Sequence, residues 1–327
     1  MRKLLVALGG LVALGVATLW FLANPFGGAG KPVIIDVVAG QSVATIAQTL
    51  EHDGVISSAL LFRADCLVEG TPTFRPGYYE IATNSSFSRV RSVFAGLPNA
   101  DAVAIRPGTT LHFLGIDLAS VRGGDFAVQF LADERRAAAV SPWHPNGSLE
   151  GLLGLGEYVI GLGETPEHLL TRMTARFTSR MAEIGITPST TLHGLSAYQL
   201  VVAASIVEKE GYYRVNMPKV ARVILNRLRR GGGLQMDSTV LYFFNQDGGT
   251  VTHAMLATKT DYNTYLHAGL TPTPICDPSV YALRAMMNPP KGTWLYFTLI
   301  SRDGTMAFST TFAQQLANER LAASRGI

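Results

Sequence analysis

Two glutamates close a stretch of the chain that is otherwise apolar. The stretch ASIVEKEGYY, residues 204–213, carries them as Glu208 and Glu210. Side chains two positions apart on a helix point to roughly opposite sides, so these carboxylates do not converge on one bond. Conventional glycosidases bring two carboxylates to one bond, about 5 to 9.5 Å apart. Glycan cleavage at this stretch would therefore depend on a single acid.

Glu210 is the better candidate for that acid. It lies over Ile206 and Val207 at helical spacing, a more apolar bed than that of Glu208. An apolar surrounding and the negative end of a helix both disfavour a carboxylate, so both raise its pKa. Glu210 is therefore expected to hold a proton near neutral pH. The alternative is that the helix end reaches the surface and that both acids are solvated.

The helix that delivers the two acids has recognisable ends. Ser196 and Gln199 fit a capping box, which starts the helix near Ala197. Residues 200–207 leave almost no polar face, and a helix that is apolar all round is buried. Gly211 is a natural C-terminal stop. The acids are thus predicted to occupy the last turn of a buried helix.

Groups that suit a sugar cleft follow this helix. A second helix is predicted from residue 217, with Pro218 in its first turn and Gly231 after its end. Beyond it, amides, hydroxyls and aromatic rings occur in a short loop before an apolar segment and again in the stretch DYNTY. Rings stack on sugar faces and polar groups bind hydroxyls and N-acetyl groups, although Tyr and Asn are also common in ordinary loops. The candidate sugar-binding residues are Gln235, Asp237, Ser238, Thr239, Tyr262, Asn263 and Tyr265.

The first residues of the chain read as a membrane anchor. Residues 4–23 carry no charge and are just long enough to span a bilayer as a helix. Arg2 and Lys3 precede them, which predicts a cytoplasmic N-terminus with the rest of the chain outside. A cleaved signal peptide is the alternative, although no clean A-x-A site follows the apolar run.

The segments between this anchor and the acid helix predict a mixed α+β fold. Residues 24–32 are a Gly/Pro linker, and a strand, two helices and a returning strand then follow within about 50 residues, with Ser42 as the first N-cap. Residues 112–148 read as mixed short segments, including the loop WHPNG. A helix capped by Thr165 precedes the acid helix.

Several function classes lack support in the sequence. The formal net charge of +3 comes partly from the N-terminal flank and does not indicate nucleic acid. There is no phosphate-binding loop, G-x-S-x-G elbow or H-E-x-x-H motif. Cys66 and Cys276 show no metal spacing, and two free buried thiols are favoured over a single bridge. We expect no metal and no cofactor.

Taken in order, the motifs resemble a known family. The series ASIVEKE, VARVILNRL, LQMDSTVLY, YNTY, GLTPTPI and WLYF is similar to the YceG-like (MltG) family of membrane-anchored endolytic murein transglycosylases. The resemblance extends from the anchor to residue 297, and the strand-helix-helix-strand unit resembles a LysM-like module. The family's catalytic acid falls on Glu210, in agreement with the pKa argument. Its LEG motif appears as residues 149–151, which makes Glu150 a candidate for the substrate site.

The resemblance implies an activity and a location. It implies a peptidoglycan lytic transglycosylase, a lyase that cleaves the MurNAc-β-1,4-GlcNAc bond to give 1,6-anhydro-MurNAc ends and terminates nascent strands. It also implies a single-pass plasma-membrane protein with an extracytoplasmic catalytic domain, whose partners are glycan strands and peptidoglycan synthases. The expected divisions are a cytoplasmic tip (1–3), a transmembrane anchor (4–23), a linker (24–32), a LysM-like subdomain (33–100) and a catalytic α+β domain (101–327).

The sequence departs from the family pattern at several positions. The family usually has threonine after its catalytic glutamate, where this chain has Gly211. Other departures fall at residues 154–158, 216–217, 271–274 and 306–308. They keep three alternatives open: a hydrolysing muramidase, a catalytically weak or inactive peptidoglycan-binding scaffold, and a tethered adaptor that binds partner proteins.

Overall fold

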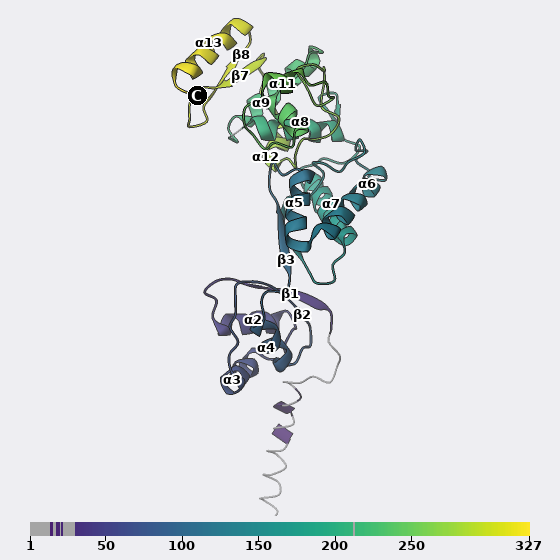
Figure 1. Ribbon diagram of the computed structural model, residues 1–327, viewed down its shortest axis with the longest axis vertical. Helices are drawn as coiled ribbons and strands as arrows, with labels where there is room; N and C mark the ends of the chain where they lie inside the picture. The colour runs from purple at the N-terminus through teal and green to yellow at the C-terminus, as the bar shows by residue number, and fades with distance from the viewer. Residues whose placement is uncertain (1–13, 16–17, 20, 22–29, 212) are drawn as a thin grey trace, which may run out of the picture. The chain divides into compact units, whose positions relative to one another are not determined.

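The computed structural model describes residues 14–15, 18–19, 21, 30–211 and 213–327 (Figure 1). The expected anchor therefore lies largely outside the described residues. Within the described part of the chain, no helix is long and apolar enough to cross a membrane. The chain divides into two compact units, residues 1–103 with 158–164 and residues 104–157 with 165–327. Each unit mixes helices with small two-stranded sheets, so the α+β class predicted from the sequence is confirmed.

The first unit has the predicted strand-helix-helix-strand order. Strands β1 and β2 pair antiparallel from Pro32↔Ala82 to Val37↔Gly77. Side chains of Tyr79, Phe62 and Phe94 are fully buried between this ribbon and the helices. Its elements are β1 (Pro32–Val37), α2 (Val43–His52), α3 (Ala59–Glu69), β2 (Gly77–Ala82) and α4 (Phe87–Ala95).

The strands β3 (Asp101–Ile105) and β4 (Gly156–Ile160) form a second ribbon, and the division between the units falls inside both strands. Two helices, α5 (Leu111–Arg122) and α6 (Gly124–Ala139), follow β3. The prediction of mixed short segments was therefore wrong for residues 112–139, whereas the loop predicted at WHPNG is confirmed. Gly123, at φ +89°, is the single residue between the helices, so the Gly123-Gly124 pair marks a break between two full helices and not a longer irregular segment.

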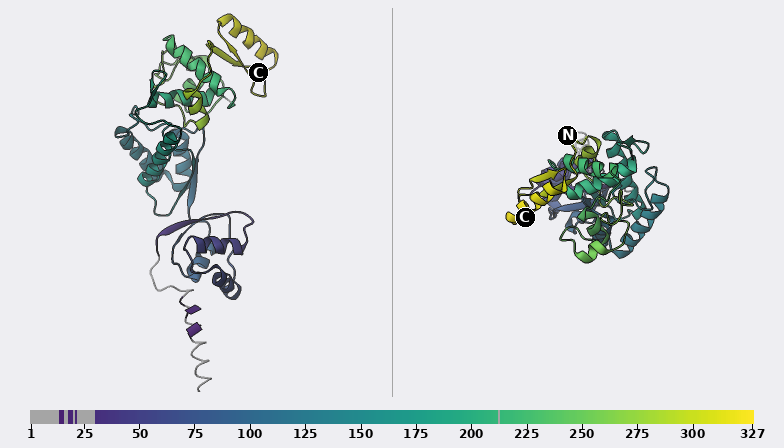
Figure 2. Two further views of the ribbon diagram at one scale, coloured as in Figure 1. Left: turned by 180° about the vertical axis from the view of Figure 1, so that it is seen from behind. Right: turned by 90° about the horizontal axis from the view of Figure 1, so that it is seen from above.

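The second unit is mainly helical around the site. Helix α7 (Pro166–Glu183) packs against α6, and Thr165 caps it as predicted. Helix α8 (Ala197–Glu210) is buried over nearly its whole length and starts with the predicted capping box. Around it lie α9 (Met217–Arg229), α10 (Asp237–Phe243) and α12 (Val280–Met287) (Figures 1 and 2). The short elements are β5 (Thr191–Leu192), β6 (Leu195–Ser196) and α11 (His253–Ala257).

The C-terminal elements are fastened to α9. Strands β7 (Tyr296–Leu299) and β8 (Met306–Ser309) pair antiparallel, and α13 (Phe312–Ser324) contacts both. The Asn226 amide donates to the carbonyls of Gly292 and Trp294, at 3.1 and 2.9 Å.

Cys66 and Cys276 are both free and buried, which confirms the prediction of two separate thiols.

Candidate active site

Glu210 is the last residue of α8 and lines a cavity of about 300 Å³. Its side chain is partly exposed, because the apolar body of α8 ends one turn earlier. The cavity lies entirely within the second unit. Its other lining residues are Thr110, Lys209, Asp237, Ser238, Leu241, Tyr242, Gln246, Asp247, Gly248 and Ile275.

The environment of Glu210 favours its protonated form. Removal from water raises the pKa of Glu210, and the nearby charge of Asp237 adds to this effect. The Ser238 hydroxyl and backbone N–H donate to Oε1 of Glu210, at 2.7 and 3.3 Å, and together with the Arg227 guanidinium they lower the pKa. Burial outweighs these contacts, so the net shift is upward. Glu210 can therefore hold a proton at a higher pH than an ordinary glutamate.

Arg227 is a site residue that the sequence analysis missed. Its charge acts on Glu210 and lowers the pKa of that carboxyl, and its guanidinium donates to the carbonyl of Leu234 and, from Nε at 2.6 Å, to that of Leu295. The signal in the sequence is its position on α9, three residues after the buried Ile224, where the buried stripe should continue with an apolar side chain. An arginine on that stripe indicates acceptors within the fold, here the carbonyls of Leu234 and Leu295.

The segment that carries Ser238 is held in place by Thr264. The backbone N–H of Gln235 donates to the Thr264 carbonyl at 3.0 Å, and that of Met236 donates to its hydroxyl at 3.0 Å. Gln235 itself is exposed, has φ +49°, and does not line the Glu210 cavity. Residues 237–239 were expected in a loop, but they form the first turn of α10. This turn brings the Ser238 hydroxyl to Glu210.

The remaining candidate sugar-binding residues divide into two groups. Asp237 lines the cavity and accepts a hydrogen bond from the Tyr265 hydroxyl at 2.6 Å. Thr239 and Asn263 are fully buried and bond to neighbouring loop atoms, so they hold the wall of the site. The Tyr262 hydroxyl pairs with a threonine hydroxyl behind the cavity, and its ring lies near that of a second tyrosine, Tyr242.

Glu150 lies behind Tyr242 and not at the cavity surface. Its side chain is 2% exposed, and its carboxylate accepts hydrogen bonds from the Leu111 N–H and, at 3.0 Å, from the Tyr242 hydroxyl. Burial raises the pKa of Glu150 to about 7. Tyr242, which the sequence analysis also missed, is thus oriented from behind by Glu150 while it lines the Glu210 cavity.

The first acid of the pair has a structural partner. Glu208 accepts a hydrogen bond from the backbone N–H of Ser279, at 2.9 Å, where α12 begins. Lys209 forms an ion pair with Asp247 at the rim of the cavity. The two glutamates therefore face different surroundings, as their spacing predicted.

Gly211 fits its surroundings only because it lacks a side chain. A Cβ at this position would lie 2.6 Å from Cγ of Met217 and 2.7 Å from the carbonyl oxygen of Val207. Two departures from the family pattern, at 211 and 217, are thus in contact with each other. The Met217 side chain occupies the space that a residue at position 211 would need.

We expect Gly211→Thr to lower the free energy of unfolding by about 1–3 kcal/mol, because it overpacks this contact. In a Met217→Ala background the cost should fall but not vanish, since the clash with the Val207 carbonyl remains. Denaturant unfolding of the two single variants and the double variant measures this coupling. Unchanged stability of Gly211→Thr would contradict the contact.

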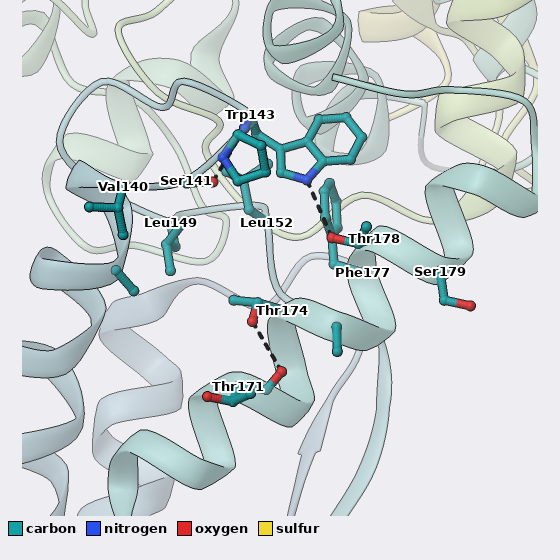
Figure 3. Close-up of a pocket in the computed structure, with 13 residues that line it drawn as sticks. Val140, Ser141, Trp143, Leu149, Leu152, Thr171, Thr174, Phe177, Thr178 and Ser179 are labelled. Atoms are coloured by element: carbon teal, nitrogen blue, oxygen red, sulfur yellow. Dashed lines mark hydrogen bonds between the residues drawn. The ribbon is translucent and has the colours of Figure 1, made fainter. Parts of the chain in front are cut away.

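Another cavity of the second unit does not carry the chemistry. It measures about 620 Å³ and lies between α6, α7 and the loop that contains Trp143 (Figure 3). Its walls are apolar or hydroxyl-bearing, and the Trp143 indole donates to the Thr178 hydroxyl at 3.4 Å. Of the residues that the structure describes, no carboxylate, histidine or cysteine lines it. Among the described residues, no three His, Cys, Asp or Glu side chains gather as a metal site.

Comparisons with known proteins find similar sequences and a similar fold over most of the chain. A model of the YceG-like family matches residues 35–321. The chain is 25% identical over 298 residues to the "Endolytic murein transglycosylase" of Bacillus subtilis (strain 168), covering 86% of this chain and 82% of that protein. It is 26% identical over 312 residues to the protein of the same name from Streptococcus pneumoniae serotype 2 (strain D39 / NCTC 7466), covering 85% of this chain but only 56% of that longer protein. A crystal structure of a YceG-like protein from Listeria monocytogenes has the same fold, with a TM-score of 0.60 at 23% identity, over 88% of this chain and 99% of that one.

Proposed function

This chain belongs to the YceG-like family, and we propose that it is an endolytic murein transglycosylase, a lyase that cuts peptidoglycan strands. The relatives with which it shares most of its length carry that name. The observation that carries the proposal is Glu210, a single carboxyl with a raised pKa at a cavity. Two further carboxyls line the same cavity, but Asp237 accepts a hydrogen bond from Tyr265 and Asp247 forms an ion pair with Lys209, so we assign the acid and base roles to Glu210 alone.

The chemistry follows from one acid that works twice. Protonated Glu210 donates its proton to the glycosidic oxygen between MurNAc and GlcNAc, and the bond opens through an oxocarbenium-like state. The resulting carboxylate then takes the proton of the C6 hydroxyl of the same MurNAc, whose oxygen attacks C1. The products are a 1,6-anhydro-MurNAc end and a free GlcNAc end, and no water is consumed. Because the nucleophile is intramolecular, its effective concentration is high and a second carboxylate is unnecessary.

The neighbours of Glu210 suit the two halves of this cycle. The Ser238 hydroxyl and N–H stabilise the carboxylate that forms when the proton leaves. Asp237, Tyr265 and Tyr242 offer polar groups near the cavity for sugar hydroxyls or the N-acetyl group. We retain Gln235, Thr239, Tyr262, Asn263 and Glu150 as candidate substrate residues. The buried ones, Thr239, Asn263 and Glu150, would act by holding the residues that form the wall of the Glu210 cavity.

Ser238→Ala should move the high-pH limb of kcat/KM upward by about one pH unit. The variant removes the 2.7 Å hydrogen bond to the Glu210 carboxylate, so the pKa of Glu210 rises further. Activity needs the protonated acid and is lost as the pH rises through that pKa, so the loss should occur later. The pH profile of strand cleavage measures this, with exposed Ser179→Ala as the control. An unmoved limb would mean that Ser238 does not tune Glu210.

The location and the modules belong to the same proposal. Residues 4–23 would anchor the chain in the plasma membrane, with residues 1–3 cytoplasmic and the catalytic domain, residues 101–327, outside. The strand-helix-helix-strand unit, within residues 33–100, would serve as a LysM-like module. Such an anchor would hold the site near new glycan strands, so peptidoglycan synthases are the expected partners.

Product analysis tests the proposed reaction. Purified peptidoglycan is digested with the full chain in detergent, and the new ends are read by mass spectrometry. Anhydro-MurNAc ends are expected. Ends heavier by one water would indicate a muramidase, and binding without cleavage would indicate a scaffold.

A further inference from the structure

Three exposed arginines line a second cavity in the same unit as Glu210. The cavity measures about 410 Å³ and receives Arg180 from α7, Arg214 from the segment after α8, and Arg284 from α12. The Arg214 guanidinium lies 3.8 Å from the ring centroid of Tyr281. Stacking on an aromatic ring fixes the plane of the guanidinium and leaves its N–H groups free to bind an anion.

The charge of this cavity is not balanced within the described residues. Arg180 pairs with Glu183 at 3.2 Å, and both side chains are about half exposed. In the described part of the chain, neither Arg214 nor Arg284 has a carboxylate within 4.0 Å. The nearest acid of α8, Glu208, is occupied by the Ser279 N–H. Three guanidinium groups therefore face one carboxylate.

The floor of the same cavity is apolar. Leu153, Phe177 and Met181 line it and are buried. An apolar floor below guanidinium groups suits a ligand with aliphatic parts and carboxylates, such as a short acidic peptide.

The arginine cavity continues toward Glu210 through a third cavity. Pro107 lines both the arginine cavity and a middle cavity of about 460 Å³. Lys209 and Asp247 line both the middle cavity and the Glu210 cavity. The middle cavity and the Glu210 cavity thus meet at the last turn of α8, and the arginine cavity joins the middle one at Pro107, all within the second unit.

We propose that the arginine cavity binds the carboxylates of the stem peptide that MurNAc carries, an inference that rests on the proposed function. The stem is attached to the sugar whose glycosidic bond is cut, so it must leave the Glu210 cavity along the protein surface. The adjoining hollows offer that route, and Arg214 and Arg284 bind the carboxylates at its end. The enzyme would thereby prefer strands whose stems are present and not amidated.

Direct binding tests the cavity without relying on cleavage. The full chain is titrated with a fluorescent stem tetrapeptide, and in parallel with the same peptide whose carboxyls are amidated. The Arg214→Gln/Arg284→Gln variant should bind the free-acid peptide about tenfold more weakly, as expected for the loss of two partly exposed charge pairs. The matched control is Arg63→Gln/Arg320→Gln, two exposed arginines elsewhere on the chain, which should bind as the wild type does. The Arg214→Lys/Arg284→Lys variant, which keeps the charge, should recover part of the affinity.

Cleavage gives the second readout. The ratio of kcat/KM for stem-bearing strands to that for stem-free strands should fall about tenfold in Arg214→Gln/Arg284→Gln. Equal binding of the free-acid and amidated peptides, or equal binding by the glutamine variant, would overturn the proposal. So would arginine-dependent binding of pyrophosphate but not of the stem peptide. If wild type and Arg214→Gln/Arg284→Gln both cut strands with the same ratio of kcat/KM, the proposed function would stand and the stem-binding site would be excluded. If the wild type bound the stem through these arginines but cut no strands, the binding site would stand and the proposed function would be excluded.

Discussion

Glu210→Gln is expected to lower strand cleavage by about 10²–10⁴-fold, the usual contribution of a positioned general acid. Glutamine keeps the size of the side chain and an oxygen that accepts from Ser238, at the end of the same buried helix. It supplies no proton to the leaving oxygen and cannot later act as a base. Binding of peptidoglycan should remain, because the cavity keeps its shape. The measurement is the rate at which anhydro-MurNAc ends appear, beside a pull-down of the variant on insoluble peptidoglycan.

The matched control lies two residues away. Glu208→Gln makes the same isosteric change in the same helical turn, and its amide oxygen can still accept from the Ser279 N–H. It should retain activity within a few-fold of the wild type, because the change only weakens one structural hydrogen bond by removing the charge of its acceptor. If Glu208→Gln abolished cleavage while Glu210→Gln did not, the catalytic acid would be assigned to the wrong glutamate. Cleavage unaffected by either change would exclude a role for both.

Local signals in the sequence were enough to predict the helix that carries Glu210. The capping box of Ser196 and Gln199, the apolar body of the helix and the stop at Gly211 all act within a few residues, so they can be read without a tertiary structure. The same holds for the N-caps at Ser42 and Thr165. The raised pKa of Glu210 also follows from local burial, although its hydrogen bonds to α10 do not.

The partners of Glu210 could not be read in the same way. The charge of Arg227 acts on it from α9, and the Ser238 hydroxyl bonds to it from α10, and both effects depend on how the helices pack. The sequence assigned Ser238 to a loop, because a helix of seven residues that starts without a side-chain cap gives little periodic signal. Glu150 was expected near substrate, but its carboxylate accepts hydrogen bonds from Leu111 and Tyr242, which are far from it in sequence.

Glu150 belongs to a group of three buried carboxyls around the segment 148–153. Glu134 accepts from the Leu149 N–H and the Ser148 hydroxyl, and Asp277 accepts from the Leu153 N–H at 3.1 Å. Burial is the main cause that raises the pKa of each of the three. The charge of Glu134 adds to the rise at Glu150, and that of Glu150 adds to the rise at Asp277. The group is therefore most stable when it carries its protons.

Glu150→Gln should make the protein more stable than the wild type at neutral pH and flatten the pH dependence of its stability. The unfolded carboxyl ionises near pH 4.5, whereas the folded one has a pKa of about 7. Between these values the unfolded state binds fewer protons, so the wild-type free energy of unfolding falls as the pH rises, by about 3 kcal/mol from this group. Below pH 4.5 the carboxyl is protonated in both states and the penalty vanishes.

Glutamine has the shape of the neutral carboxyl but cannot ionise. Its oxygen can accept from the Leu111 N–H, and its NH2 group can donate to the Tyr242 oxygen, which reverses the wild-type bond in which the Tyr242 hydroxyl donates to Glu150. Denaturant unfolding at pH 4.5 and pH 8, followed by the fluorescence of buried Trp143, gives the comparison, with exposed Glu157→Gln as the control. The gain of Glu150→Gln over the wild type should be close to zero at pH 4.5 and about 3 kcal/mol at pH 8. Parallel curves for the two proteins would mean that Glu150 is ionised in the folded state. The carboxylate would then hold Leu111 and Tyr242 by charge, and its replacement should destabilise the protein at every pH above 4.5.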